Sequence, residues 1–153
     1  MEGTKERYTL IPYCTPFGHV VDFKPAVISK CQGSKWEGAG KKIKKKFRDP
    51  TFDATKPSSS KNQEFFEIEY RSFENFILYW NPSAWMTRQI MIAEVYRLSL
   101  HLKSKSPSKK YLVMMDNCSS HKKLPMLDNL EFVYFQPGCT GWHPGFSIVK
   151  NGS

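Results

Sequence analysis

Asp116 is the residue whose position most clearly suggests chemistry. It directly follows the apolar run Tyr111–Met115. A run that is apolar on both faces is typical of a central strand in a covered sheet, and open α/β sheets bind ligands beyond the carboxyl ends of such strands. A carboxylate there could contact such a ligand. The alternative is that Asp116 and Asn117 only cap the following turn, and position alone does not decide between the two roles.

Basic residues in two parts of the chain point to nucleic acid. The residues that we expect to contact phosphates are Lys41, Lys42, Lys44, Lys45, Lys46, Arg48, Lys109 and Lys110, with Lys103 and Lys105 nearby. Each lysine can neutralise a phosphate and release counterions, which gives salt-dependent binding without sequence readout. Trp36 and Phe47 flank the first cluster and could stack on bases. The alternative is a solubilising loop or a nuclear-import signal.

Two Cys/His pairs have spacings that superficially match zinc ligands. Cys118 precedes His121 by three positions, and Cys139 precedes His143 by four. The four cysteines otherwise lie far apart without a C-x-x-C motif, which favours reduced, buried thiols over a disulfide framework.

The composition limits the class of protein. The chain has 153 residues, of which 40% are hydrophobic and 14% aromatic; this suffices for one core and excludes a largely disordered protein. The net charge of +9 and the isoelectric point of about 9.4 favour a polyanionic partner, nucleic acid before a membrane. No apolar run approaches the roughly 18 residues of a membrane span, and no secretory signal is present, so we expect an intracellular protein.

The first part of the chain predicts a hairpin and a basic insertion. Residues 7–14 and 19–24 are rich in β-branched and aromatic residues, flank a Pro/Gly turn, and lead into a further apolar segment at 26–28. Pro12 indicates an edge or a bulge, because proline lacks the N–H that a sheet ladder needs. We expect residues 31–64 to be a loop or a flexible basic insertion.

The rest of the chain predicts alternating strands and helices. Periodicity leaves residues 64–80 ambiguous between strand and helix. A helix of about 20 residues is expected after Ser83, its candidate N-cap. The strand Tyr111–Met115 precedes a short predicted helix at 124–130 and a strand at 130–135, which together have the size of a βαβ unit. This order predicts the α/β class, a mixed sheet with flanking helices.

Four motifs in matching order resemble those of one family. They are Lys5-Glu6-Arg7 with Lys24-Pro25, Ala84-Trp85-Met86-Thr87, Tyr111–Met115 with Asp116-Asn117 and His121, and Gln136-Pro137-Gly138-Cys139-Thr140 with His143-Pro144. Together they are similar to the DDE superfamily endonuclease domain of the Tigger, pogo, jerky and centromere protein B group of transposases. The basic run at residues 41–46 is not part of this resemblance.

The resemblance implies a ribonuclease H-like fold, a mixed sheet with helices on both faces. Its motifs cover most of residues 1–153, which we therefore expect to form a single partial domain with the insertion at 31–64. The family's first strand would precede the Lys-Glu-Arg motif, and its closing helix would extend beyond the last residue. We expect both elements to be missing.

The resemblance also implies metal-dependent chemistry. In the family, three carboxylates hold two Mg²⁺ or Mn²⁺ ions, which activate water and then a DNA 3′-hydroxyl for cleavage and strand transfer. Asp116 matches the second carboxylate, the first lies on the missing strand, and Phe146 stands in the third position. The acids that could substitute are Asp22, Glu64, Glu67, Glu69 and Glu74, although a solvated surface is the simpler explanation of the glutamates.

These observations predict a nuclear DNA-binding protein that derives from a DDE transposase and has lost its cleavage activity. Binding should be nonspecific because no helix-turn-helix unit is visible. One alternative is an active metal-dependent endonuclease or transposase fragment that uses Asp116 and unmatched acids. Another is a relic that does not fold, because losing the first strand exposes a sheet edge. Zinc is the less favoured interpretation, since the resemblance accounts for His121 and His143.

Overall fold

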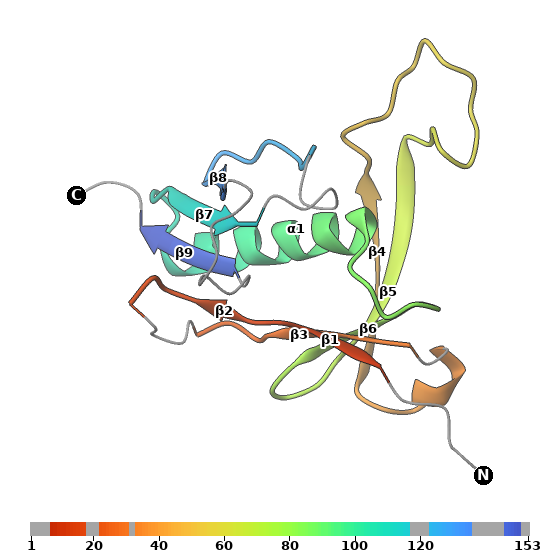
Figure 1. The fold of residues 1–153 in the computed structure, drawn as a ribbon, viewed down its shortest axis with the longest axis horizontal. Coiled ribbons are helices and arrows are strands. Elements are labelled where there is room, and N and C mark those ends of the chain that lie inside the picture. Colours follow the sequence, from red (N-terminus) through yellow and green to blue (C-terminus); the bar gives the residue numbers. More distant parts are fainter. Residues whose placement is uncertain (1–6, 18–21, 31–32, 117–122, 136–145, 151–153) are drawn as a thin grey trace.

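The residues that the structure describes form two β-sheets and one long helix (Figure 1), in agreement with the expected mixed α/β class. The computed structural model describes residues 7–17, 22–30, 33–116, 123–135 and 146–150. The five-stranded sheet has the order β1-β3-β6-β5-β4, and the four-stranded sheet has the order β2-β9-β7-β8. The strands are β1 (Tyr8–Ile11), β2 (Tyr13–Cys14), β3 (Ala26–Ser29), β4 (Lys41–Arg48), β5 (Phe65–Ser72), β6 (Ile77–Trp80), β7 (Tyr111–Met115), β8 (Leu130–Tyr134) and β9 (Phe146–Lys150); the helix is α1 (Arg88–Lys105).

The N-terminal strand changes sheets at Pro12. Strands β1 and β2 flank this residue, and each lies at the edge of its sheet, as the proline predicted. The predicted hairpin is confirmed in part: β1 pairs antiparallel with β3, at the end of the predicted second segment, and not with residues 22–24, while residues 19–21 lie outside the described residues. Strand β3 is suited to the interior of the sheet because Ala26 and Ile28 are fully buried, whereas Asp22 and Lys24 in the predicted strand are exposed.

The predicted loop at residues 31–64 contains strand β4. All eight of its residues pair with β5, from Lys41 opposite Ser72 to Arg48 opposite Phe65. Lysine is depleted in strands, and this obscured an alternating pattern in which Ile43 and Phe47 pack against the core. The loop prediction was therefore wrong for β4.

The connection between β4 and β5 has hydrogen bonds of its own. The Asn62 side chain donates from Nδ2 to the carbonyls of Asp53, Lys56 and Pro57, and its Oδ1 accepts from the Asp53 N–H. The Asp49 carboxylate accepts from the Thr51 N–H and hydroxyl. Side chains thus add to the few backbone hydrogen bonds that hold this segment.

Several boundaries in the second half differ from those predicted. The ambiguous stretch at 64–80 forms strands β5 and β6. The N-cap of α1 is Thr87, whose Oγ1 accepts from the Ile90 N–H at 3.2 Å, and not Ser83. Ser83 lies in a turn where the Asn81 side chain accepts from its N–H. No helix forms at residues 124–129, where a short helix was predicted; Asp128 and Asn129 lie in a turn directly before β8.

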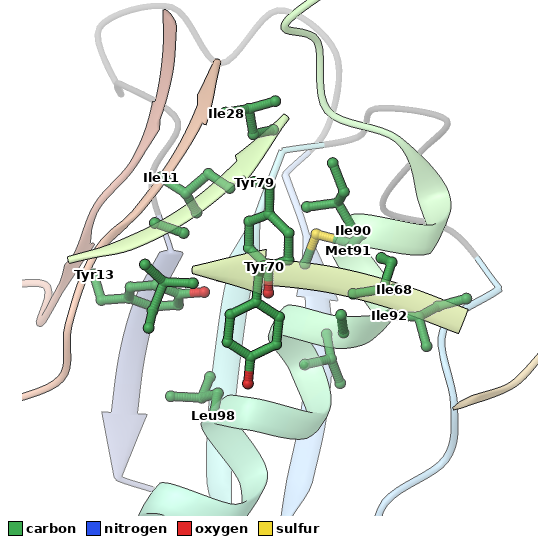
Figure 2. Packing of buried hydrophobic residues seen from close by; sticks show 14 of the residues in the cluster. Ile11, Tyr13, Ile28, Ile68, Tyr70, Tyr79, Ile90, Met91, Ile92 and Leu98 are labelled. Atoms are coloured by element: carbon green, nitrogen blue, oxygen red, sulfur yellow. The ribbon is translucent and has the colours of Figure 1, made fainter. Parts of the chain in front are cut away.

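Helix α1 connects the two sheets through one hydrophobic core. Nine of its 18 residues are buried, and the core cluster includes residues from both sheets. Figure 2 shows helix residues Ile90, Met91 and Ile92 packed beside Tyr70 and Tyr79 of the larger sheet. No helix among the described residues is long and apolar enough to cross a membrane.

A buried carboxylate joins α1 to both sheets. Glu94 is fully buried and accepts hydrogen bonds from the hydroxyls of Tyr13 in β2 and Tyr79 in β6, each at 2.8 Å. Arg97 forms an ion pair with Glu94 and donates to its two carboxylate oxygens at 2.7 and 2.8 Å. Arg97 also donates to the Lys24 carbonyl. Burial and the adjacent Glu94 raise the pKa of both tyrosines well above the ordinary value, so both hydroxyls remain protonated donors.

We expect Glu94→Gln to lower the free energy of unfolding by about 3 kcal/mol, because it leaves the Arg97 charge buried without its counterion. Urea denaturation monitored by tryptophan fluorescence measures this loss. Lys103→Gln is the control, since it removes the ion pair with the exposed Asp128 and should leave the midpoint almost unchanged. Equal midpoint shifts in the two variants would contradict the assigned role of Glu94.

A second ion pair fixes the start of the β4–β5 connection to α1. Arg88 donates to both carboxylate oxygens of Asp49, at 2.7 and 2.8 Å. This guanidinium holds the pKa of Asp49 well below its usual range. The connection is therefore anchored at the N-terminal end of the helix.

Asp49→Asn should lower the free energy of unfolding by about 1–2 kcal/mol at neutral pH. Because the folded-state pKa is the lowered one, the contribution is complete above the unfolded pKa near 4 and is lost as the pH falls below it. Urea denaturation of both proteins at pH 7, 5 and 3 tests this. A stability difference that stays constant down to pH 3 would contradict the prediction.

Candidate nucleic-acid interface

Strand β4 carries six cations in eight residues. Alternation along the strand places Lys42, Lys44, Lys46 and Arg48 on its outer face. Lys41 and Lys45 share the other face with Ile43 and Phe47, which pack against the core. All six cationic side chains belong to exposed residues. The first predicted basic cluster is thus a β-strand with cations alone on one face and cations beside apolar residues on the other.

Acidic residues of β5 partly neutralise the outer face. The ion pairs are Lys42–Glu69 at 3.1 Å, Lys44–Glu67 at 3.5 Å and Arg48–Glu64 at 3.6 Å. Lys46 instead lies over the Phe65 ring, 4.8 Å from its centroid. Exposed pairs of this kind contribute little to stability but reduce the local positive potential. Six cations still face only three glutamates.

The second half of β4 lines a groove against α1. This groove has a volume of about 280 Å³ and is lined by Lys45, Lys46, Phe47, Arg48, Tyr70, Ala93, Tyr96, Arg97 and Leu100. Phe47 and Tyr96 stack with their centroids 5.3 Å apart and their planes 27° apart. Both rings are half-buried, so each retains exposed surface. The groove therefore combines aromatic surface with positive charge.

The charges around the groove differ in how they are compensated. Glu94 neutralises Arg97, and Glu64 lies near Arg48. Lys41, Lys45 and Lys46 take part in no ion pair within the part of the chain that the structure describes, but the Lys46 ammonium lies over the Phe65 ring. Lys45 is consequently the groove cation most available to an anionic ligand.

The second basic cluster is separate from β4. Lys109 and Lys110 are exposed in the linker between α1 and β7, and neither lines the groove. Figure 1 shows the start of β7 well apart from β4. Lys103 forms an ion pair with Asp128 at 2.7 Å, and Lys105 forms one with Asp22 at 2.5 Å. The structure therefore divides the predicted phosphate contacts between two regions.

The two aromatic residues predicted to stack on bases differ in position. Phe47 lies in the groove, whereas Trp36 lies in the short 3₁₀ helix Gly33–Trp36 before β4 and does not line the groove. Sequence reasoning missed Tyr96 and Leu100 as groove residues, since both had the pattern of ordinary helix core positions. No local signal could have identified them, because the groove forms only when β4 packs against α1.

Asp116 lies at the carboxyl end of β7, as predicted, and β7 is an interior strand flanked by β8 and β9. The β7–β9 ladder pairs Met114 with Ser147, so Phe146 at the start of β9 lies at the same sheet edge as Asp116. The backbone thus brings together the two positions that the resemblance assigned to the second and third carboxylates.

The candidate substitute acids occupy other places. Glu64, Glu67 and Glu69 pair with cations of β4, and Glu74 is exposed between β5 and β6. A hydrogen bond from Lys105 lowers the pKa of Asp22. No three His, Cys, Asp or Glu side chains within the described ranges form a group that could hold a metal ion. Cys118, His121, Cys139 and His143, the residues of the less favoured zinc interpretation, lie outside those ranges.

No protein-family model matches the chain, and no solved structure matches it significantly. Strand β4, the groove and the motifs of the sequence therefore carry the evidence on function.

Proposed function

We propose that this protein binds nucleic acid, DNA in particular, through the β4–β5 hairpin. The observation that carries the proposal is the concentration of six cations on β4 opposite only three glutamates of β5. Strands rarely carry so much charge of one sign, because it neither packs in a core nor favours pairing. A row of phosphates is the partner whose spacing and charge suit such a strand.

Binding of this kind is nonspecific. Lysines on a strand contact phosphate oxygens, which position a protein on DNA without reporting its sequence. The glutamates of β5 lower the positive potential of the hairpin and so limit the affinity, and salt screens the potential that remains. The second cluster, Lys109 and Lys110, adds to the overall attraction from a separate region.

The proposal includes descent from a DDE transposase, nuclear location and loss of cleavage. The motifs around Asp116 support the descent, and the net charge of +9 suits a nuclear, DNA-rich setting. Phe146 at the position of the third carboxylate supports the loss of Mg²⁺- or Mn²⁺-dependent chemistry, because two hard cations need several oxygen ligands.

Purified protein should bind a fluorescent duplex with an affinity that falls steeply between about 50 and 200 mM salt. Fluorescence anisotropy in the presence of Mg²⁺ or Mn²⁺ gives the affinity, and the same DNA is then recovered on a gel. Intact DNA is the expected result. Binding that does not weaken with salt would refute the proposal, while metal-dependent nicking abolished by Asp116→Ala would instead show an active endonuclease.

Two variants of equal net charge test the assignment to β4. Lys41→Gln/Lys45→Gln should weaken duplex binding and reduce the magnitude of the salt slope by about 2, because two phosphate contacts are lost. Lys109→Gln/Lys110→Gln removes the same charge elsewhere and should have the smaller effect. A larger effect of the second variant would assign the principal contact to the linker between α1 and β7.

A further inference from the structure

We propose that the groove between β4 and α1 binds one base and the adjacent phosphate of a single-stranded nucleic acid. This inference rests on the proposed function and identifies the form of nucleic acid that the site prefers. The groove, lined by Lys45, Phe47, Tyr96 and Leu100 among others, offers surfaces that neither the outer face of β4 nor the linker before β7 possesses.

The size of the groove suits a single nucleotide. Its volume of about 280 Å³ is close to the lower end of small-ligand sites, which begin near 300 Å³. Ala93 and Leu100 supply apolar surface, and the stacked rings of Phe47 and Tyr96 supply aromatic surface. A flat, apolar base with an anionic linkage beside it matches this combination.

The phosphate contact falls to Lys45. Glu94 already neutralises Arg97 through two hydrogen bonds, and Glu64 lies 3.6 Å from Arg48. Lys45 is an exposed groove residue without an ion pair in the described part of the chain. Lys46, the other groove lysine without an ion pair in the described residues, lies over the Phe65 ring, so Lys45 gives one phosphate contact for each base bound.

The aromatic wall selects single strands over duplexes. In a duplex the faces of the bases are stacked on one another, so Tyr96 could stack on a base only after it had left the helix. In a single strand each base presents its face freely. Leu100 is 58% exposed and borders the groove, leaving that side open to an approaching strand.

The test compares a labelled 15-residue oligothymidylate with a labelled duplex of the same length by fluorescence anisotropy. Wild-type protein should bind the single strand more tightly at equal salt. Tyr96→Leu should weaken single-strand binding roughly 5- to 100-fold, because the stacking surface is lost, and should change duplex binding by no more than about twofold. Lys45→Gln should reduce the magnitude of the single-strand salt slope by about 0.7.

Control variants separate the groove from general electrostatics and from folding. Lys44→Gln lies on the outer face of the same strand and should leave the preference for the single strand intact. Leu100→Glu changes an exposed residue and places a negative charge beside the groove, so it tests the inference even if Tyr96→Leu fails to fold. It should weaken single-strand binding more than duplex binding.

The outcomes distinguish this inference from the proposed function. If wild-type protein shows salt-dependent binding but Tyr96→Leu and Leu100→Glu leave the single-strand preference unchanged, the groove inference is wrong and the proposed function stands. Equal affinity of the wild type for both probes also refutes the groove inference. If neither probe binds in a salt-dependent way, the proposed function itself fails.

Discussion

The carboxylate of Glu94 is the contact on which the arrangement of both sheets depends. It accepts from Tyr13 of the smaller sheet, from Tyr79 of the larger sheet and from Arg97 on its own helix. A buried carboxylate is costly unless its hydrogen bonds are satisfied, so an alternative packing of α1 would leave a charge without partners. Ser99 and Asn129, joined by two buried hydrogen bonds, fix the helix to the start of β8 in the same way.

This buried cluster also determines which surface is left for a ligand. Arg97 lines the groove, but its charge is directed to Glu94 and its guanidinium lies 4.0 Å from the Phe23 ring centroid. The residues that remain for recognition are Tyr96 and Leu100 on α1 and Lys45 on β4. The ion pair with Glu94 thus gives Arg97 a structural role, and Lys45 remains the groove cation that is available to a ligand.

The sequence predicted those features that local pattern determines. The apolar run Tyr111–Met115 predicted an interior strand followed by Asp116, and Pro12 predicted an edge strand. Both predictions are confirmed, because each feature depends on a few neighbouring residues. Strand β4 was missed since its lysines conceal the alternation of Ile43 and Phe47. The groove and the Glu94 cluster could not be predicted, because they join segments brought together only by tertiary packing.

The hairpin shows how a strand with so much charge of one sign can form. Neighbouring cations on its outer face are about 6.6 Å apart, which costs about 0.6 kcal/mol for each adjacent pair in water. Glu64, Glu67 and Glu69 offset this repulsion from the paired strand, and Lys46 lies over Phe65. The same pairing lowers the outer face's attraction for a polyanion. The inner face has no acid paired with Lys45 among the described residues, so the strand's remaining attraction is directed towards the groove and its aromatic wall.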